Sequence, residues 1–291
     1  MGGSVRNYVL LFLLALIWGS SFILMKRGLE VYSFIELANL RMCIAFFSLT
    51  PFIPKAIRSV KRKHYLPLLI TAVFGNLLPA FLFAKAQTQI DSGLVGTLNA
   101  LVPLFTLILG VYFFSLRPSK ANVFGILLGL LGALILAFST LRQGAVFNVY
   151  ILLVVVATIF YAISINVIKK YLDDLNPFYI TTLAFIIISP FPIIWLFNST
   201  FFYHLQIHPD GFKALSYIAV LAVFGTSIAT IVFNKLLSCS SAIFASSITY
   251  LIPIVAIFWA ILDGEIITFY HLLGFVIILI GVYLVNKRKP L

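Results

Sequence analysis

The feature that most constrains this chain is a series of long apolar stretches without charge. Residues 8–25 and 151–168 each lack any charged side chain, and about eighteen such residues in a helix cross the ~30 Å hydrocarbon core of a bilayer. These runs are too long for strands. Hydrophobic residues make up 62% of the chain and charged residues 10%, a balance that leaves more apolar surface than a soluble domain can hide from water. The sequence therefore predicts an all-α integral membrane protein.

Ten long apolar stretches with few or no charges follow one another, joined by connections mostly shorter than about a dozen residues. The first follows Arg6 but has no small-x-small cleavage pattern, so it is interpreted as a helix and not as a signal peptide. No GxxxxGK[ST] loop is present to hold ATP, which argues against direct ATP-driven pumping. The expected transmembrane helices are residues 8–25, 34–53, 66–83, 92–114, 123–141, 151–168, 178–197, 215–233, 242–262 and 272–285.

The basic residues are unevenly placed between the two sides that these spans define. The net charge is +12, but the Lys and Arg residues lie at helix ends, where retention on the cytoplasmic side explains them better than nucleic acid does. Fourteen fall on the side of the N-terminus, five on the other side, and Arg41 within a span. Both termini are therefore expected in the cytoplasm. Short loops favour a bacterial inner membrane, although residues 287–291 also resemble a dilysine retrieval tail.

The two halves of the chain match each other. An offset of 150 gives eight identities in a 32-residue window, where about three are expected by chance in so biased a composition. An offset of 143 pairs residues 18–30 with residues 161–173, and an offset of 149 pairs Gly125 and Gly132 with Gly274 and Gly281. The identities at offset 150 are Ala72, Val73, Phe74, Gly75, Phe83, Lys85, Leu101 and Pro103 with Ala222, Val223, Phe224, Gly225, Phe233, Lys235, Leu251 and Pro253.

Five spans in each copy make the second copy enter the membrane upside down. The expected architecture is ten transmembrane helices in two inverted five-helix repeats, residues 1–143 and 144–291. Such repeats suit alternating access around a site near the midplane of the membrane. The competing interpretation is a duplication inherited without transport.

Several motifs resemble the drug/metabolite transporter superfamily, in particular the ten-helix EamA-type permeases, over roughly residues 8–286. They are residues 15–22 (ALIWGSSF), Leu40-Arg41, 99–103 (NALVP), 249–253 (TYLIP), 263–268 (DGEIIT) and the glycines Gly274 and Gly281. The resemblance implies a central cavity enclosed by helices 1–4 and 6–9, with helices 5 and 10 set apart. It also implies substrates such as amino acids and other small metabolites, often exported. One departure is residues 114–118 (FSLRP), where the family usually carries a glutamate.

Two charged residues fall inside a predicted span. Arg41 lies about 12 Å into the second helix and is costly there unless it pairs, snorkels or faces water, so it is a candidate for substrate binding or gating, or else a structural arginine. Glu36 is the only carboxylate within a span and the first candidate for proton coupling, although its place near the outer end favours plain solvation.

Four further residues are equivalent in the two repeats. Lys85 and Lys235 lie at helix ends on opposite faces, as gating charges or as lysines that snorkel. Pro103 and Pro253 lie within helices, where each removes a backbone hydrogen bond, so they are expected to kink their spans and to serve as hinges.

Polar and aromatic side chains within the spans are candidates to line the cavity, or else to hydrogen-bond neighbouring helices. Gly125, Gly129 and Gly132 form a stripe that suits close packing, either in an assembly or within the monomer. The residues expected to bind substrate or line the cavity are Trp18, Asn39, Arg41, Asn76, Asn99, Tyr161, Asn166, Thr226 and Tyr250.

These features favour a secondary active transporter, most simply an exporter of a zwitterionic or anionic amphiphile such as an amino acid. Partners are a small-molecule substrate, the bilayer and, as a candidate coupling ion, the proton. A passive facilitator or channel is the alternative within transport, and a membrane-embedded enzyme or a scaffold the alternative outside it. No cofactor, metal site or catalytic residue is expected, since the sequence shows no HExxH and no motif that joins an acid to a histidine, and its two cysteines form no cluster.

Overall fold

The protein is described by a computed structural model over residues 2–90, 92–141, 149–262 and 269–286, and these residues form helices and no strand. The elements before residue 143 are α1 (Gly2–Leu29), α2 (Phe34–Leu49), η1 (Thr50–Phe52), α3 (Ile53–Ser59), η2 (Arg62–His64), α4 (Tyr65–Ala72), η3 (Val73–Leu77), α5 (Leu78–Ala86), α6 (Ser92–Leu98), η4 (Asn99–Leu101), α7 (Val102–Phe114) and α8 (Lys120–Leu141). Those after it are α9 (Tyr150–Tyr171), α10 (Pro177–Ile188), α11 (Pro190–Phe197), α12 (Phe201–Ile207), α13 (Gly211–Ala222), η5 (Val223–Ile228), α14 (Ala229–Cys239), α15 (Ala242–Ser246), η6 (Ser247–Tyr250), α16 (Ile252–Leu262) and α17 (Phe269–Asn286).

Within the described residues, six helical segments are long and apolar enough to span a membrane. A seventh candidate is the pair α10 and α11, which is bent by 43° at Ser189 and Pro190, where proline removes a backbone hydrogen bond. Shorter apolar helices occupy Lys120–Ile135, Ala242–Val255 and Val276–Val285. The chain is therefore a multi-pass helical membrane protein. The six segments are Val5–Leu29, Phe34–Ser59, Arg62–Ala86, Leu94–Phe114, Tyr150–Tyr171 and Gly211–Cys239.

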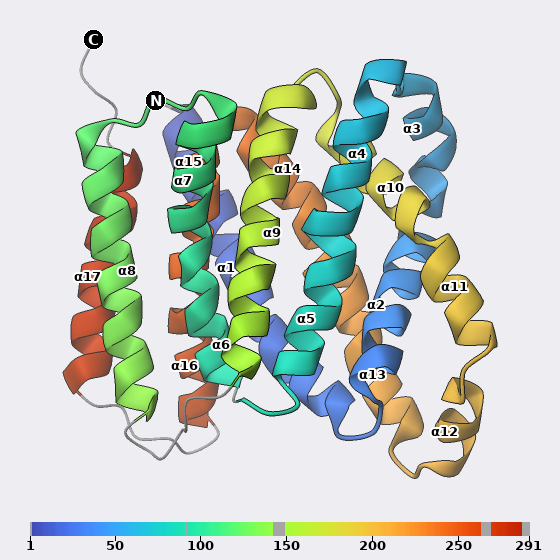
Figure 1. The fold of residues 1–291 in the computed structure, drawn as a ribbon. Helices are drawn as coiled ribbons and strands as arrows, with labels where there is room; N and C mark the ends of the chain where they lie inside the picture. The colour runs from blue at the N-terminus through green and yellow to red at the C-terminus, as the bar shows by residue number, and fades with distance from the viewer. Residues whose placement is uncertain (1, 91, 142–148, 263–268, 287–291) are drawn as a thin grey trace.

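The long helices stand side by side, and α1 begins and α17 ends at the same end of the bundle, the upper end of Figure 1. The outer surface is apolar, with side chains such as Phe47, Phe191 and Val276 more than half exposed. In water such a surface would promote aggregation, whereas lipid chains solvate it. The arrangement leaves polar groups to the interior and to the two ends.

Four irregular turns interrupt the helices that face the interior. The two π-helical segments η3 and η5 fall at equivalent places, because both contain the sequence Val-Phe-Gly. The 3-10 segment η4 comes directly before α7, and one residue separates the end of η6 from the start of α16. The second residues of these two α-helices are Pro103 and Pro253. Each proline thus lies in the first turn of a helix, where its missing N–H costs no intrahelical hydrogen bond.

Helices α8 and α17 pack against each other along their lengths at one side of the bundle (Figure 1). Their contact is close because glycines face backbone: a Cβ on Gly125 would lie 2.7 Å from the Gly281 carbonyl oxygen, and one on Gly132 2.9 Å from the Gly274 carbonyl oxygen. Gly129 faces the ring of Tyr250. The glycine stripe of α8 therefore packs against other parts of the same monomer.

Candidate functional site

A cavity of about 120 Å³ lies in the interior of the bundle, large enough for several water molecules or a small metabolite. Its walls come from α1, α2, α4, η3, α5, η4, α7, α9, α10, η5, α14, α15, η6 and α16. No described residue of α8 or α17 takes part. The cavity is thus enclosed by the segments that the family resemblance implied, with the α8–α17 pair outside it.

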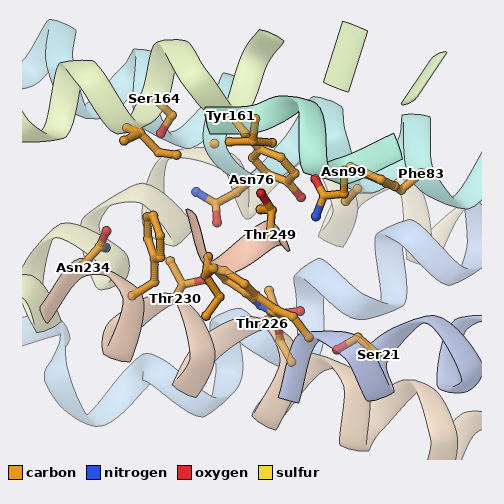
Figure 2. A pocket seen from close by; sticks show the side chains of 18 of the residues that line it. Ser21, Asn76, Phe83, Asn99, Tyr161, Ser164, Thr226, Thr230, Asn234 and Thr249 are labelled. Carbon is orange, nitrogen blue, oxygen red and sulfur yellow. Dashed lines mark hydrogen bonds between the residues drawn. The ribbon is translucent and has the colours of Figure 1, made fainter. Parts of the chain in front are cut away.

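Six of the nine residues that the sequence assigned to the cavity do line it. They come from six different elements that are widely separated in the chain and converge here. Figure 2 labels four of them, Asn76, Asn99, Tyr161 and Thr226. The six are Trp18, Arg41, Asn76, Asn99, Tyr161 and Thr226.

The other three lie outside the cavity wall and bond backbone carbonyls. Asn39 donates to the carbonyl of Ile35, one turn earlier in its own helix. Asn166 donates to the Thr106 carbonyl and so joins α9 to α7. Tyr250 is fully buried, and its hydroxyl donates to a carbonyl of α8 at 2.9 Å. Asn166 and Tyr250 thus bond neighbouring helices, which was the alternative interpretation, whereas Asn39 bonds its own helix.

Arg41 reaches from α2 to the π-helical segment η5. Its Nε donates to Thr226 Oγ1 at 2.6 Å, and the same hydroxyl donates onward to the Leu221 carbonyl at 3.2 Å. Arg41 forms no ion pair with any carboxylate among the described residues. A positive charge therefore faces the cavity with only a neutral protein partner.

The π-helical segments present polar groups to the cavity. Asn76 Nδ2 donates to the Thr71 carbonyl, five residues earlier, as Thr226 does to that of Leu221. Such bonds satisfy carbonyls that the widened turn displaces from regular α-helical pairing. In η5 the Trp18 ring nitrogen also donates to a backbone carbonyl, that of Gly225, at 3.0 Å.

Aromatic rings form two walls of the cavity. Trp18 packs on Phe233 with ring centroids 5.4 Å apart, and Tyr161 stacks on Phe83 with centroids 5.8 Å apart. Phe22 extends the second wall at 6.2 Å from Phe83. The cavity therefore combines apolar faces with a cation and several neutral hydrogen-bonding groups.

Glu36 lies outside the cavity, and the expectation that it is solvated is wrong. It is 2% exposed and forms a capping box with Ser33 at the start of α2. Its other oxygen, Oε1, lies 2.8 Å from Nδ1 of His204 in α12. This pair joins the two halves of the chain at the lower end of Figure 1, where α2 begins and α12 lies.

A second acid–histidine pair lies at the upper end, between the loop before α4 and the loop after α9. His64 is fully buried, accepts from the Lys61 N–H through Nδ1, and places Nε2 3.0 Å from Asp174. Lys63 also contacts this carboxylate at 2.7 Å. The sequence motifs did not reveal either pair, because their members are more than 100 residues apart. Neither pair belongs to a group of three metal-ligating side chains among the described residues.

The remaining candidates lie away from the cavity. Lys85 is exposed near the end of α5, with its Nζ 5.6 Å from the ring centre of Phe34, and Lys235 is exposed on α14. Pro103 and Pro253 are buried in the first turns of α7 and α16 and follow 3-10 turns. The cavity residues that the sequence did not single out include Thr71, Ser164, Thr230 and Asn234, and for Ser164 its match to Ser21 in the repeat was the available signal.

Comparison with known proteins gives one consistent result. The chain is 28% identical to the uncharacterized inner membrane transporter YedA of Escherichia coli K12, over 97% of this chain and 90% of that protein. It is 26% identical to a probable amino-acid metabolite efflux pump of Salmonella typhimurium, over 97% and 95%. A crystal structure with a TM-score of 0.69 and 14% identity covers 97% of this chain and 96% of its own, and shares the fold. Since the model of the EamA-like transporter family matches residues 6–138 and 148–287, this chain belongs to that family of membrane transporters.

Proposed function

We propose that this transporter is a secondary active exporter of a small amphiphile of the amino-acid type. Arg41 carries the proposal: it lines a cavity inside an apolar bundle and hydrogen-bonds only to the neutral Thr226 among the described residues. A cation inside an apolar bundle is costly without an anion, so an anionic group on the substrate is the natural partner. The Salmonella relative is named a probable amino-acid metabolite efflux pump, which supports both the substrate class and the direction.

We propose further that ten spans form two inverted repeats, residues 1–143 and 144–291. Contacts between the halves recur in equivalent pairs: Trp18 with Phe233 and Tyr161 with Phe83 are related by the sequence offsets of 143 and 150. Two more sets follow the same rule. In the first set, Ser21 contacts Gly225 and Ser164 contacts Gly75. In the second set, Gly125 contacts Gly281 and Gly132 contacts Gly274.

Alternating access requires contacts that close each side of the cavity in turn. Glu36 with His204 at the lower end and His64 with Asp174 at the upper end meet this requirement, because each joins one repeat to the other. We propose that the first pair parts when the cavity opens to the lower side and the second when it opens to the upper side. The charged and exposed Lys85 and Lys235 lie on these two faces as secondary gating candidates, and Pro103 and Pro253 as hinges of their spans.

The excess of basic residues on the side of the N-terminus supports a cytoplasmic upper end, with both termini inside a bacterial inner membrane. The inner-membrane relative YedA is consistent with that location. Protons are the proposed coupling ion, with the buried Glu36 as the first candidate to carry them.

A passive facilitator is the second candidate function. It is favoured by the composition of the cavity wall, which among the described residues contains no carboxylate that could carry a proton. Coupled export predicts that dissipating a proton gradient stops accumulation while counterflow continues. A facilitator predicts no accumulation against the substrate gradient with or without a proton gradient.

Counterflow of radiolabelled amino acids in proteoliposomes tests the proposal. Arg41→Ala should abolish counterflow, Arg41→Lys should retain a part of it, and Lys26→Ala, which removes an exposed charge away from the cavity, should behave as the wild type. Thermal melting of each purified variant reports whether it is folded. Unchanged kinetics in folded Arg41→Ala protein would remove this residue from the site, and absence of counterflow for every amino acid would refute the substrate class.

A further inference from the structure

The two repeats place different side chains at equivalent positions beside the cavity. Helices α2 and α10 begin at N-caps Ser33 and Asn176, whose side chains each accept a backbone N–H of the first turn. Arg41 is the eighth residue after the first N-cap, and Ala184 is the eighth after the second. As α2 packs against η5, α10 packs against η3. A methyl group thus stands next to η3 where a guanidinium stands next to η5.

Three polar side chains in and beside η3 have oxygen atoms that receive no hydrogen bond from the described residues. Asn76 uses its Nδ2 to bond the Thr71 carbonyl, which turns its Oδ1 away from that carbonyl, and Oδ1 has no partner among the described residues. Figure 2 shows this amide across the cavity from Thr226. The hydroxyl of Thr71 is buried without a partner, and Ser164 forms no hydrogen bond through its side chain in the described part of the chain.

These three side chains form one small polar pocket around Gly75. The residues Thr71, Asn76 and Ser164 all line the cavity and are 3%, 8% and 4% exposed. A Cβ on Gly75 would collide with the hydroxyl of Ser164 and lie 3.7 Å from the Thr71 methyl, so only glycine leaves this space open. In the other repeat, Ser21 differs because its hydroxyl donates to the Ile17 carbonyl at 2.8 Å.

Buried acceptors that lack donors are costly, and an ammonium group supplies three donors. We infer that the pocket of Thr71, Asn76 and Ser164 binds the ammonium group of a zwitterionic substrate whose carboxylate lies at Arg41. This inference rests on the proposed function and adds the orientation of the substrate. The Arg41 side chain fills a place in one repeat that the small side chain of Ala184 leaves open in the other. The ammonium group of the substrate occupies this open place.

The test uses three probes of similar shape: L-leucine, 4-methylpentanoate, which lacks the amine, and 3-methylbutylamine, which lacks the carboxylate. Their affinities for the purified full-length protein are measured by thermal stabilisation as a function of probe concentration. Ser164→Ala and Asn76→Val should each lower the affinity for L-leucine by about 10- to 100-fold, the loss expected for hydrogen bonds to a charged group. The affinity for 4-methylpentanoate should remain, which also shows that each variant is folded.

Two substitutions serve as matched controls. Asn76→Thr has the shape of the valine variant but keeps a hydroxyl that can bond the Thr71 carbonyl, as Thr226 bonds that of Leu221, and should retain most of the preference for L-leucine. Ser21→Ala removes the equivalent hydroxyl, which is already bonded, and should leave the ratio of L-leucine to 4-methylpentanoate affinity unchanged.

Different outcomes refute different statements. If the wild type binds L-leucine and 4-methylpentanoate equally, or if Ser164→Ala weakens both alike, the ammonium pocket is wrong while the Arg41 site stands. If none of the three probes stabilises the wild type, or if 3-methylbutylamine alone does, the proposed substrate class fails as well.

Discussion

Breaking the contact between Glu36 and His204 should open the cavity to the lower side. The replacement His204→Leu removes the ring nitrogen that lies 2.8 Å from the carboxylate and leaves the capping box of α2 in place, because Ser33 alone forms it with Glu36. The His204 side chain is 42% exposed, so solvent screens the pair and its contribution is about 1 kcal/mol. If the pair forms only in states closed on the lower side, its loss raises the open population roughly fivefold.

Cysteine labelling measures this population from each side of the membrane. Cys43 and Cys239 are replaced by alanine, Thr230 in the cavity wall becomes cysteine, and an impermeant maleimide is added to right-side-out or inside-out vesicles. His204→Leu should raise the labelling rate from the lower side only. Asp174→Asn is the matched change at the upper end and should raise it from the other side only.

The two variants should therefore raise the labelling rate from opposite sides of the membrane. Equal acceleration from both sides would indicate general loosening of the bundle, and unchanged rates in both variants would show that neither pair controls access. Either result would refute the gating role assigned to these contacts, while leaving the cavity and its ligand untouched.

Two further predictions concern stability. Gly125→Ala should lower the stability of the detergent-solubilised protein by about 1–3 kcal/mol, because the added Cβ meets the Gly281 carbonyl oxygen at 2.7 Å and the backbone cannot move aside as a side chain does. Leu127→Ala, at an exposed position of the same helix, is the control. An equal loss of stability in both variants would contradict this reasoning. The hydrogen bond from Lys63 is the main cause that lowers the pKa of Asp174 below its usual 3.8. The stabilising effect of this carboxylate is therefore present above pH 3.8 and lost as the pH falls through the lower folded-state pKa, so the difference in melting temperature between wild type and Asp174→Asn should shrink on that acidification.

The sequence correctly predicted an all-helical membrane protein, since apolar run length alone determines where a chain can cross lipid. Of the ten expected spans, six helical segments, or seven with the bent pair α10 and α11, are long and apolar enough within the described residues. It also found six of the polar and aromatic residues that line the cavity, but it missed others such as Thr71, Thr230 and Asn234. It could not separate Arg41, which faces the cavity, from Asn39, which bonds its own helix, because that difference depends on helix rotation. Nor could it pair Glu36 with His204, since 168 positions separate them and only tertiary packing brings α12 to the start of α2.

Each π-helical turn has a consequence for how these spans tolerate length changes. Removing one residue from Val73–Leu77 or Val223–Ile228 would restore ordinary α-helical pairing but rotate everything beyond it by about 100°, so side chains now bathed by acyl chains would swing toward the interior. Insertions and deletions should accordingly be absent from these two short stretches in functional homologues, whereas the loops between spans can vary in length.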